Sequence, residues 1–402
     1  MEQLKCLFCQ KKYPLDLFHL FCPECNEPLL VTHSVPSPEI HYNKKYPLER
    51  YFDYLPIKKR NPEFCLGEGS TPLLKLSRLM ERFDLPEVFA KNEMQNPTAS
   101  FKDRGTVIAV HKALTMGVNS IGTVSTGNMA ASTAAYGARA GIKTWVLVSE
   151  STSEEKIYSA AVHGAIILKV KGDYGELFYK SLKIGEKNRI YFMNSTDPFR
   201  IEGYKVTAFE LFDQFKEKAP SYIIVPVSSG GHIIGLMKAF KELKKRQKIT
   251  KYPNFIGVQP EKASPITNSF LKKEPKCTRI KKANTLAQSI NNPAPPGGNI
   301  VLEMIREMKG QMIKVSDIEI LRAQSLLASY EGLFCLPASA ATLAGLFKLK
   351  REKKLDPQDQ IVLIITGAGF KNVKILNPSK MKIFQTSIKK LDQTVSSIIK
   401  QI

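Results

Sequence analysis

From residue 119 onward, short and nearly continuous apolar runs alternate with longer segments of helical periodicity. The apolar runs predict buried strands at 119–125, 142–149, 164–170, 189–194, 221–227, 254–259 and 360–366. The longer segments predict helices at 103–117, 128–141, 153–164 and 203–215. This alternation indicates an α/β fold with mostly parallel sheets that are covered by helices on both faces.

The end of the chain has a different pattern, with apolar positions that step by three and four residues along one helical face. These positions are Ile388, Leu391, Val395, Ile398 and Ile402. The spacing predicts a C-terminal helix within residues 376–402. We expect this helix to dock on the body of the protein, with a subunit contact as the alternative.

Lysine and arginine outnumber the acidic residues by 59 to 37, which gives a formal net charge of +22. Such a charge favours polyanion binding, but the lysines are spread along solvated helix faces and accompany no recognised nucleic-acid motif. We therefore expect no nucleic-acid partner. The chain has no run of 18 apolar residues and no apolar stretch at the N-terminus of the kind found in signal peptides. These features predict a cytoplasmic protein without a membrane span.

Four of the seven cysteines fall within the first 25 residues, in the pattern C-x2-C-x12-C-x2-C. The four are Cys6, Cys9, Cys22 and Cys25. Two such thiolate pairs can converge on one tetrahedral ion, for which Zn²⁺ is the natural occupant. Because all four ligands come from the protein, the predicted zinc site is structural; four reduced thiols without a metal are the alternative.

The segment "NPTASFKDRG" at 96–105 places Lys102 at the start of a predicted helix. The free amide groups of a helix start carry a partial positive charge, which makes a lysine amine easier to deprotonate. A neutral amine can attack a carbonyl group to form a Schiff base. Lys102 is therefore a candidate catalytic residue.

Three further segments lie where predicted strands end, and ligands of α/β folds gather at that edge of a sheet. "STGNMAAS" at 125–132 offers side-chain donors, "VPVSSGGHIIG" at 225–235 offers helix-start amides that suit a phosphate group, and "VLIITGAGFKN" at 362–372 offers a threonine hydroxyl. Each segment alone is also compatible with a tight turn.

Together, in this order, the four segments resemble the pyridoxal-phosphate (PLP) enzymes of fold type II, and the threonine synthase family in particular. "NPTASFKDRG" is similar to the lysine motif of that family, and "STGNMAASTAAYGARAG" to its asparagine loop. "NSTDPFRIEGYKV" and "EGLFCLPASAATLAG" resemble two later motifs of the same family. The resemblance covers residues 65–375 and implies two three-layer α/β/α domains.

The expected organisation has five parts. They are a zinc-ribbon-like segment at 1–33, a linker at 34–65, a large PLP-binding domain at 66–105 and 206–375, a small α/β domain at 106–205, and a C-terminal helix at 376–402. The resemblance implies PLP as cofactor and a small phosphorylated amino acid as substrate. We expect a homodimer or a monomer.

The resemblance also implies roles for individual residues. Lys102 would form the Schiff base with the cofactor and shuttle protons. The implied cofactor-binding residues are Phe101, Lys102, Asn128, Ser229, Gly230, Gly231, His232, Ile233 and Thr366. The implied ligands of the substrate phosphate are Ser125, Thr126, Asn194 and Arg200. The implied reaction converts O-phospho-L-homoserine and water to L-threonine and phosphate.

The sequence departs from the family pattern at Met129, Tyr204, Ala368 and the segment 286–299. All four departures lie where they can shape the substrate pocket, so other functions stay open. One alternative is another PLP-dependent enzyme of phosphorylated amino acids, such as a cysteate-synthase-like enzyme acting on O-phosphoserine. Others are a threonine or serine dehydratase and, outside enzymes, a zinc-ribbon nucleic-acid-binding protein on a degenerate PLP scaffold.

Overall fold

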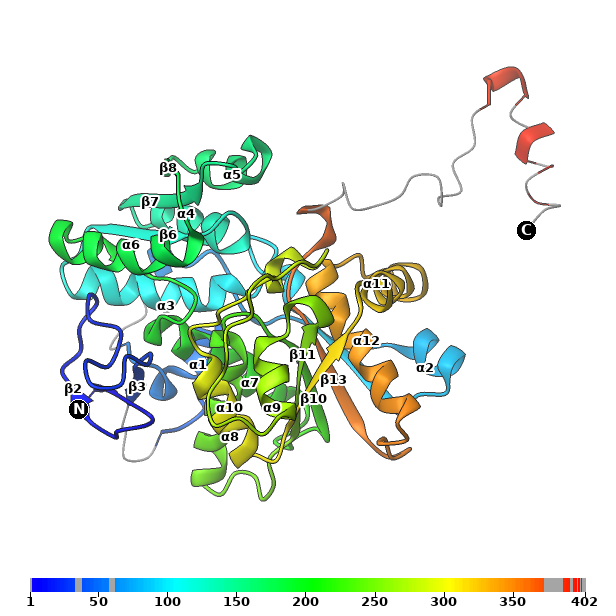
Figure 1. Cartoon of the computed structure of the whole chain (residues 1–402). Helices are drawn as coiled ribbons and strands as arrows, with labels where there is room; N and C mark the ends of the chain where they lie inside the picture. The colour runs from blue at the N-terminus through cyan, green and yellow to red at the C-terminus, as the bar shows by residue number, and fades with distance from the viewer. Residues whose placement is uncertain are drawn as a thin grey trace. The chain divides into compact units, whose positions relative to one another are not determined.

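The computed structural model describes residues 2–32, 38–57, 62–371, 386–390, 393–395, 397 and 399 (Figure 1). The chain divides into one large unit, Met1–Phe370, and a C-terminal unit, Lys371–Ile402. The predicted C-terminal helix lies mostly outside the described residues; the described part there includes a 3-10 turn at Ile388–Lys390. No helix within the described ranges is both long and apolar enough to cross a bilayer.

The larger sheet has six strands in the order β12-β11-β10-β13-β5-β4. Their bounds are β4 Leu73–Lys75, β5 Glu87–Asn92, β10 Tyr222–Pro226, β11 Asn254–Pro260, β12 Gln311–Val315 and β13 Gln360–Ile365. All neighbouring strands pair in parallel except β4, which runs antiparallel to β5. The predicted α/β class with mostly parallel sheets is thus confirmed.

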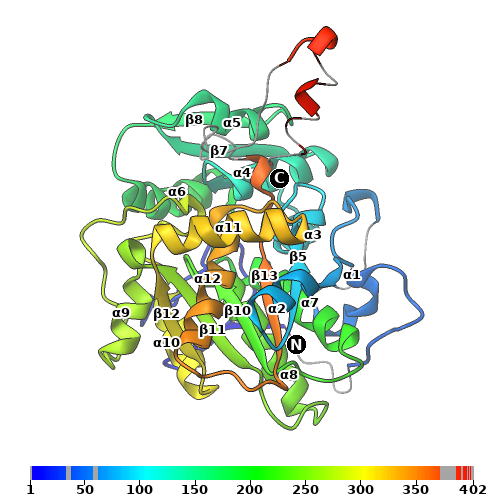
Figure 2. The ribbon, with the colours of Figure 1, turned by 90° about the vertical axis from the view of Figure 1, so that its right-hand side faces the viewer.

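Both faces of the larger sheet are covered, because alternate apolar residues of each strand enter two separate cores. Ile223 packs with one core, while its neighbour Ile224 packs with the other. One face carries α2, α11 and α12, which lie in front of the sheet in Figure 2. The other face packs against α7, α8 and α10. The bounds of these helices are α2 Ser77–Phe83, α7 Pro198–Gln214, α8 Gly231–Lys245, α10 Gly298–Glu307, α11 Asp317–Glu331 and α12 Pro337–Arg351.

The second sheet has four parallel strands in the order β8-β7-β6-β9. Its strands are β6 Ser120–Val124, β7 Lys143–Ser149, β8 Ile166–Val170 and β9 Tyr191–Phe192, and its helices are α4 Asn128–Arg139, α5 Glu154–Ala161 and α6 Tyr174–Asn188. Helix α3, Lys102–Thr115, packs on both α4 and α7 and so connects the two sheets. The remaining helices are α1 Pro47–Arg50 and α9 Pro265–Leu271.

The N-terminal segment forms a small antiparallel sheet in the order β2-β1-β3. Its strands are β1 Gln3–Lys5, β2 Lys12–Tyr13 and β3 Leu30–Thr32. The segment is attached to the body by an ion pair of 2.6 Å between Lys112 of α3 and Glu2. A second attachment is the hydrogen bond that Lys238 of α8 donates to the backbone oxygen of Val31.

The expected strands from 119 to 366 are all present, with bounds that differ by a few residues. Strands β4, β5 and β12 were not predicted. Helix α7 begins at Pro198 rather than at 203, because the Asp197 side chain accepts hydrogen bonds from the first amides of that helix. The expected irregular segment 34–65 contains α1, and its Tyr54 ring lies 4.6 Å from that of Phe209. The domain boundaries remain a prediction.

Candidate active site

Lys102 is the first residue of α3, and the loop that leads into it is held by hydrogen bonds. Asp103 fixes this loop by accepting hydrogen bonds from the backbone nitrogen and the hydroxyl of Thr98, at 2.7 and 2.6 Å. Ala99 has a φ of +53°, a left-handed conformation that is strained for a residue with a Cβ atom. The chain therefore holds the start of α3 in one definite backbone path.

The same loop is fastened to the end of β13. The backbone nitrogen of Phe101 donates to the oxygen of Thr366 at 3.1 Å, and that of Ala368 donates to the oxygen of Ala99 at 3.1 Å. Lys102 and Thr366, which are far apart in the sequence, are thus brought to one place at the carboxyl end of the larger sheet.

Aromatic rings and one positive charge surround the Lys102 amine. Its Nζ lies 4.5 Å from the centre of the Phe101 ring and 6.0 Å from that of Tyr204. Burial, together with the charge of Arg200, lowers the pKa of Lys102 from 10.5 to about 7. The sequence suggested the helix start as the cause, whereas burial contributes most.

His232 provides the clearest sign of an incomplete binding site. Its ring stacks on that of Phe101 at a centroid distance of 3.9 Å and an angle of 16°. Both ring nitrogens are buried, and neither has a hydrogen-bond partner within the described part of the chain. Burial, and next the charges of Lys102 and Arg104, hold the pKa of His232 well below 6.5, so the ring is neutral. Buried polar groups without partners are rare in proteins and need an explanation, and a ligand bound against this ring would provide one.

The glycine-rich turn after β10 leads directly into α8. Gly230 has a φ of +101°, and a Cβ atom on Gly231 would lie 2.3 Å from the backbone oxygen of Ser195. Only glycine fits at these two positions. The turn leaves the first amides of α8, which include those of His232 and Ile233, without intrahelical acceptors, and such amides bind phosphate groups.

The segment 286–299, which departs from the family pattern, supports this turn. The side-chain nitrogen of Asn292 donates to the Ser229 hydroxyl at 3.0 Å. The backbone nitrogen of Gly297 donates to the backbone oxygen of Ser229 at 2.9 Å. The altered segment therefore holds the predicted phosphate turn in place.

At the end of β13, Thr366 is buried and its hydroxyl lies 2.8 Å from that of Ser339 at the start of α12. The Ser339 hydroxyl also accepts a hydrogen bond of 3.1 Å from the backbone nitrogen of Gly367. A Cβ atom on Gly367 would lie 3.0 Å from Nδ2 of Asn128, so this turn lies against the start of α4. The structure thus brings Thr366 and Asn128 to the same side of the lysine loop.

Arg200 lies in the first turn of α7 and is fully buried. Its Nη2 donates to the backbone oxygen of Lys102 at 3.4 Å, and its Nε donates to the Tyr204 hydroxyl at 3.2 Å. Its Nη1 is buried and has no hydrogen-bond partner among the residues described. A guanidinium group binds phosphate well through two parallel nitrogens.

The other three residues expected at the substrate phosphate are arranged differently. Asn194 is buried; its oxygen accepts a hydrogen bond from the backbone nitrogen of Val124 at 2.9 Å, and its nitrogen donates to Ser181 at 3.2 Å. These bonds brace the end of β6, just before Ser125. Ser125 and Thr126 are half-buried in the loop that follows.

Four buried charged side chains, whose charges sum to zero, hold α3 in place. Arg104 bonds to both oxygens of Glu93 and both oxygens of Glu210, and Lys91 bonds to Glu210 at 2.7 Å. The group joins α3, α7 and β5. The sequence analysis did not predict this group. Its only sign in the sequence is that charged residues stand inside otherwise apolar segments.

Two polar contacts at the site were also missed. Ser339 stands in the motif "EGLFCLPASAATLAG", but nothing in the sequence connects it with Thr366. Tyr204 was recognised as a departure, but not as a partner of Arg200. Ser339 and Thr366 meet through the packing of different elements, and Tyr204 and Arg200 meet across one turn of helix. Amino-acid composition reveals neither contact.

The four N-terminal cysteines come together as expected. Their Sγ atoms all lie within 4.8 Å of one another, and those of Cys9 and Cys22 are 3.6 Å apart. Four thiolates around one zinc ion at about 2.3 Å would be about 3.8 Å apart. The donor set and its spacing therefore fit a tetrahedral Zn²⁺ ion.

Comparisons with known proteins show the family to which the chain belongs. A family model described as "Pyridoxal-phosphate dependent enzyme" matches residues 64–367. The diaminopropionate ammonia lyase structure from Escherichia coli superimposes with a TM-score of 0.67 at 17% identity, covering 78% of this chain and 88% of that one. The glycine turn, the low-pKa lysine and the His232 ring, whose nitrogens have no partner among the residues described, fit PLP. The fold and site thus define the class of fold type II PLP-dependent enzymes.

Two curated threonine synthases define the relationship further. The one from Methanocaldococcus jannaschii is 37% identical over 375 residues, which cover 92% of each chain. The one from Methanosarcina acetivorans is 36% identical and covers 91% of each chain. The chain belongs to the threonine synthase family of pyridoxal-phosphate-dependent enzymes.

Proposed function

We propose that this protein is a threonine synthase, which converts O-phospho-L-homoserine and water to L-threonine and phosphate. The observation that carries this proposal is the position of Arg200 next to Lys102. A buried guanidinium nitrogen of Arg200, which has no hydrogen-bond partner among the described residues, belongs to the group whose charge helps to lower the pKa of Lys102 to about 7. The family relationship supports the same reaction.

The cofactor would be held by the residues that converge on the lysine loop. Lys102 would hold it through its amine, and the amides of Gly230, Gly231, His232 and Ile233 would hold its phosphate together with Ser229. Phe101, Asn128 and Thr366 would face its ring. Bound PLP supplies an electron sink for carbanion chemistry at the substrate.

Lys102 provides the proton transfer. With a pKa of about 7, its Nζ is neutral in about half of the molecules at neutral pH. A lysine of ordinary pKa would be almost entirely charged there and could not accept a proton. The rings of Phe101 and Tyr204 lie beside the amine, at 4.5 and 6.0 Å from Nζ to the ring centres, and limit the directions from which a substrate can approach it.

Arg200 provides the recognition of phosphate. Its Nη1 is free to donate, while Tyr204 and the backbone of Lys102 hold the rest of the guanidinium group. Ser125 and Thr126 offer hydroxyl donors from the loop after β6, and Asn194 braces the end of that strand. A dehydratase acting on threonine or serine has no phosphate to bind and needs no such arginine.

The N-terminal cysteines would hold a structural zinc ion. All four ligand positions are filled by thiolates, which leaves no open coordination site for chemistry. The ion would instead hold together a segment whose strands contain only two or three residues each.

The assay of substrate choice tests this function. The purified chain, loaded with PLP, is assayed for phosphate release from O-phosphohomoserine and O-phosphoserine, and for deamination of threonine and serine. We expect turnover of O-phosphohomoserine alone. Lys102→Ala should abolish both the visible absorbance of the bound cofactor and the turnover, while the exposed Lys169→Ala retains both.

Two outcomes would contradict parts of the proposal separately. If Lys102→Ala keeps its colour and turnover, the assignment of the catalytic lysine is wrong. If only O-phosphoserine reacts, the site stands but the function is that of another enzyme of phosphorylated amino acids.

A further inference from the structure

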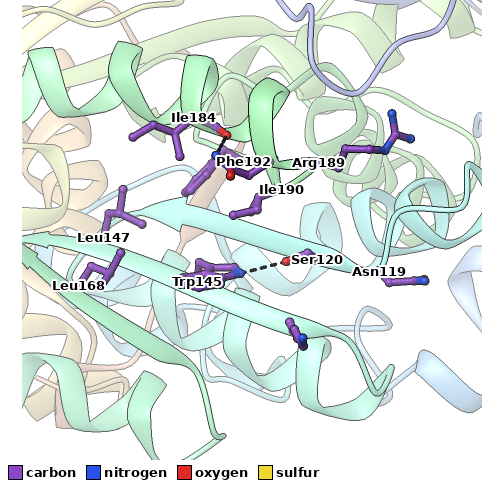
Figure 3. Close-up of a pocket in the computed structure, with 11 residues that line it drawn as sticks. Asn119, Ser120, Trp145, Leu147, Leu168, Ile184, Arg189, Ile190 and Phe192 are labelled. Carbon is purple, nitrogen blue, oxygen red and sulfur yellow. Dashed lines mark hydrogen bonds between the residues drawn. The ribbon is translucent and has the colours of Figure 1, made fainter.

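A cavity that the residues of the candidate active site do not line opens on the four-stranded sheet (Figure 3). Its volume of about 640 Å³ falls within the range of small-molecule sites. None of the residues assigned above to catalysis, cofactor or substrate lines it. The lining residues are Asn119, Ser120, Lys143, Trp145, Leu147, Leu168, Ile184, Asn188, Arg189, Ile190 and Phe192.

The body of the cavity is apolar and partly open to solvent. Trp145 and Leu168 lie on neighbouring strands of the sheet, and Ile184 faces the opening from α6 (Figure 3). Leu168, on the edge strand β8, is 44% exposed and so contributes apolar surface to the opening. The indole nitrogen of Trp145 already donates to the Ser120 hydroxyl at 2.9 Å, so the ring presents only its apolar surface.

The lining contains two charged residues, both of them basic, beside the neutral Asn119, Ser120 and Asn188. Lys143 and Arg189 are exposed, and no acidic side chain is among the described residues that line the cavity. Arg189 is at the edge of the lining, and its guanidinium group lies 5.3 Å from the centre of the Phe18 ring of the N-terminal segment. An apolar body with two cations at its margin is complementary to an amphipathic anion.

We propose that this cavity is a second ligand site, which binds a small anion with an aromatic or aliphatic body and one carboxylate or sulfonate group. The apolar body enters between Trp145, Leu168 and Ile184. The acidic group stays at the margin, where Lys143 and Arg189 neutralise it.

The chain contains a single tryptophan, Trp145, which reports binding directly. The probes are 8-anilinonaphthalene-1-sulfonate and its neutral analogue N-phenyl-1-naphthylamine, added to the full chain loaded with PLP. We expect the sulfonate to quench the Trp145 emission and to bind at least about fivefold more tightly than the neutral probe, because two exposed cations each add a modest attraction.

Variants that remove positive charges distinguish binding at this cavity from binding elsewhere on the protein. The double variant Lys143→Gln/Arg189→Gln should bind the sulfonate no more tightly than the neutral probe, and its affinity for the neutral probe should be unchanged. The matched control Lys169→Gln/Lys187→Gln removes two exposed charges that do not line the cavity, and it should behave like the parent chain. Equal affinity of the two probes for the parent chain, or no effect of Lys143→Gln/Arg189→Gln, would overturn the proposal.

A second copy of the chain is the competing occupant of this apolar surface. Sedimentation velocity of the parent chain and of Leu168→Glu decides between the two. We expect the same oligomeric state for both, and weaker binding of the sulfonate probe to Leu168→Glu. If Leu168→Glu instead converts a dimer to a monomer, the surface is a subunit contact and the ligand proposal fails.

Discussion

Arg200 and Tyr204 stand one turn apart on α7, and the guanidinium Nε donates a hydrogen bond of 3.2 Å to the phenol oxygen. Neither side chain is exposed to solvent. The Tyr204 ring occupies space that Gly105 leaves open, since a Cβ atom there would lie 2.6 Å from the ring. The tyrosine that departs from the family pattern is therefore built into the core and holds Arg200 in position.

Tyr204→Phe should weaken the recognition of the phosphorylated substrate. It removes the acceptor of a charged donor in a buried place, and hydrogen bonds to charged groups contribute about 1.5–3 kcal/mol. We expect kcat/KM for O-phosphohomoserine to fall about tenfold or more, mainly through KM, while PLP binding is kept. Tyr222→Phe, which removes an exposed hydroxyl, is the control. A Tyr204→Phe enzyme with an unchanged KM would show that the tyrosine only fills space.

The lowered pKa of Lys102 predicts the pH dependence of cofactor capture. Only the neutral amine attacks the cofactor, and the neutral fraction rises with pH until the pKa of about 7 is passed. The rate of PLP uptake by the cofactor-free chain should therefore rise up to about pH 7 and level off above it. Absorbance after rapid mixing gives the rate, and Nα-acetyl-lysine under the same conditions corrects for the titration of PLP itself.

A variant at Arg200 tests whether the charge of this residue contributes to the lowered pKa of Lys102. Arg200→Gln removes a positive charge that disfavours the protonated amine, so the pKa of Lys102 should rise and the plateau should move to higher pH. A parent chain whose uptake rate still rises steeply at pH 10 would show that the amine has an ordinary pKa.

The sequence predicted the class of fold, and it indicated four segments that the structure brings together around Lys102, because strands and turns depend on local features. Apolar runs marked the parallel strands, and glycine turns marked their ends. The four-charge group could not be predicted, because Glu93 and Glu210 lie far from each other in the chain and meet only when α3 packs on α7. That packing depends on Gly203, where a Cβ atom would lie 2.0 Å from the backbone oxygen of Arg104.

Arg104→Gln should destabilise the whole chain strongly. It leaves the carboxylates of Glu93 and Glu210 buried with Lys91 as the remaining cation of the group, and breaking a buried ion pair costs about 3–5 kcal/mol. We expect the free energy of unfolding in urea at pH 7 to fall by about this amount. Arg139→Gln, at an exposed position on α4, should change it by less than about 0.5 kcal/mol.

The same group predicts sensitivity to acid. Arg104 and Lys91 hold the pKa of Glu210 well below its usual 4.5, although burial alone would raise it. The stabilisation is therefore complete above pH 4.5 and is lost as the pH falls below that value. If Arg104→Gln and the parent chain lose stability in parallel between pH 5 and pH 3, the pairing does not control the acid response.

The zinc site should stabilise both the N-terminal segment and, through it, the phosphate turn. Glu27 accepts a hydrogen bond from Asn299 at 2.5 Å, and Asn299 stands two residues after Gly297, which bonds to Ser229 of that turn. Cys22→Ser should lower the zinc content from about one ion per chain to almost none, as measured by mass spectrometry. It should also lower Tm and weaken PLP binding, because the ordered segment supports the start of α10.

Cys65→Ser is the matched control, since this cysteine lies outside the metal cluster. Chelation of zinc from the parent chain should reproduce the loss of Tm seen in Cys22→Ser, and adding zinc back should restore it only in the parent. If the parent chain loses its zinc without any change in Tm or PLP affinity, the N-terminal segment does not stabilise the catalytic body. The contact between Glu27 and Asn299 then does not couple the zinc site to PLP binding.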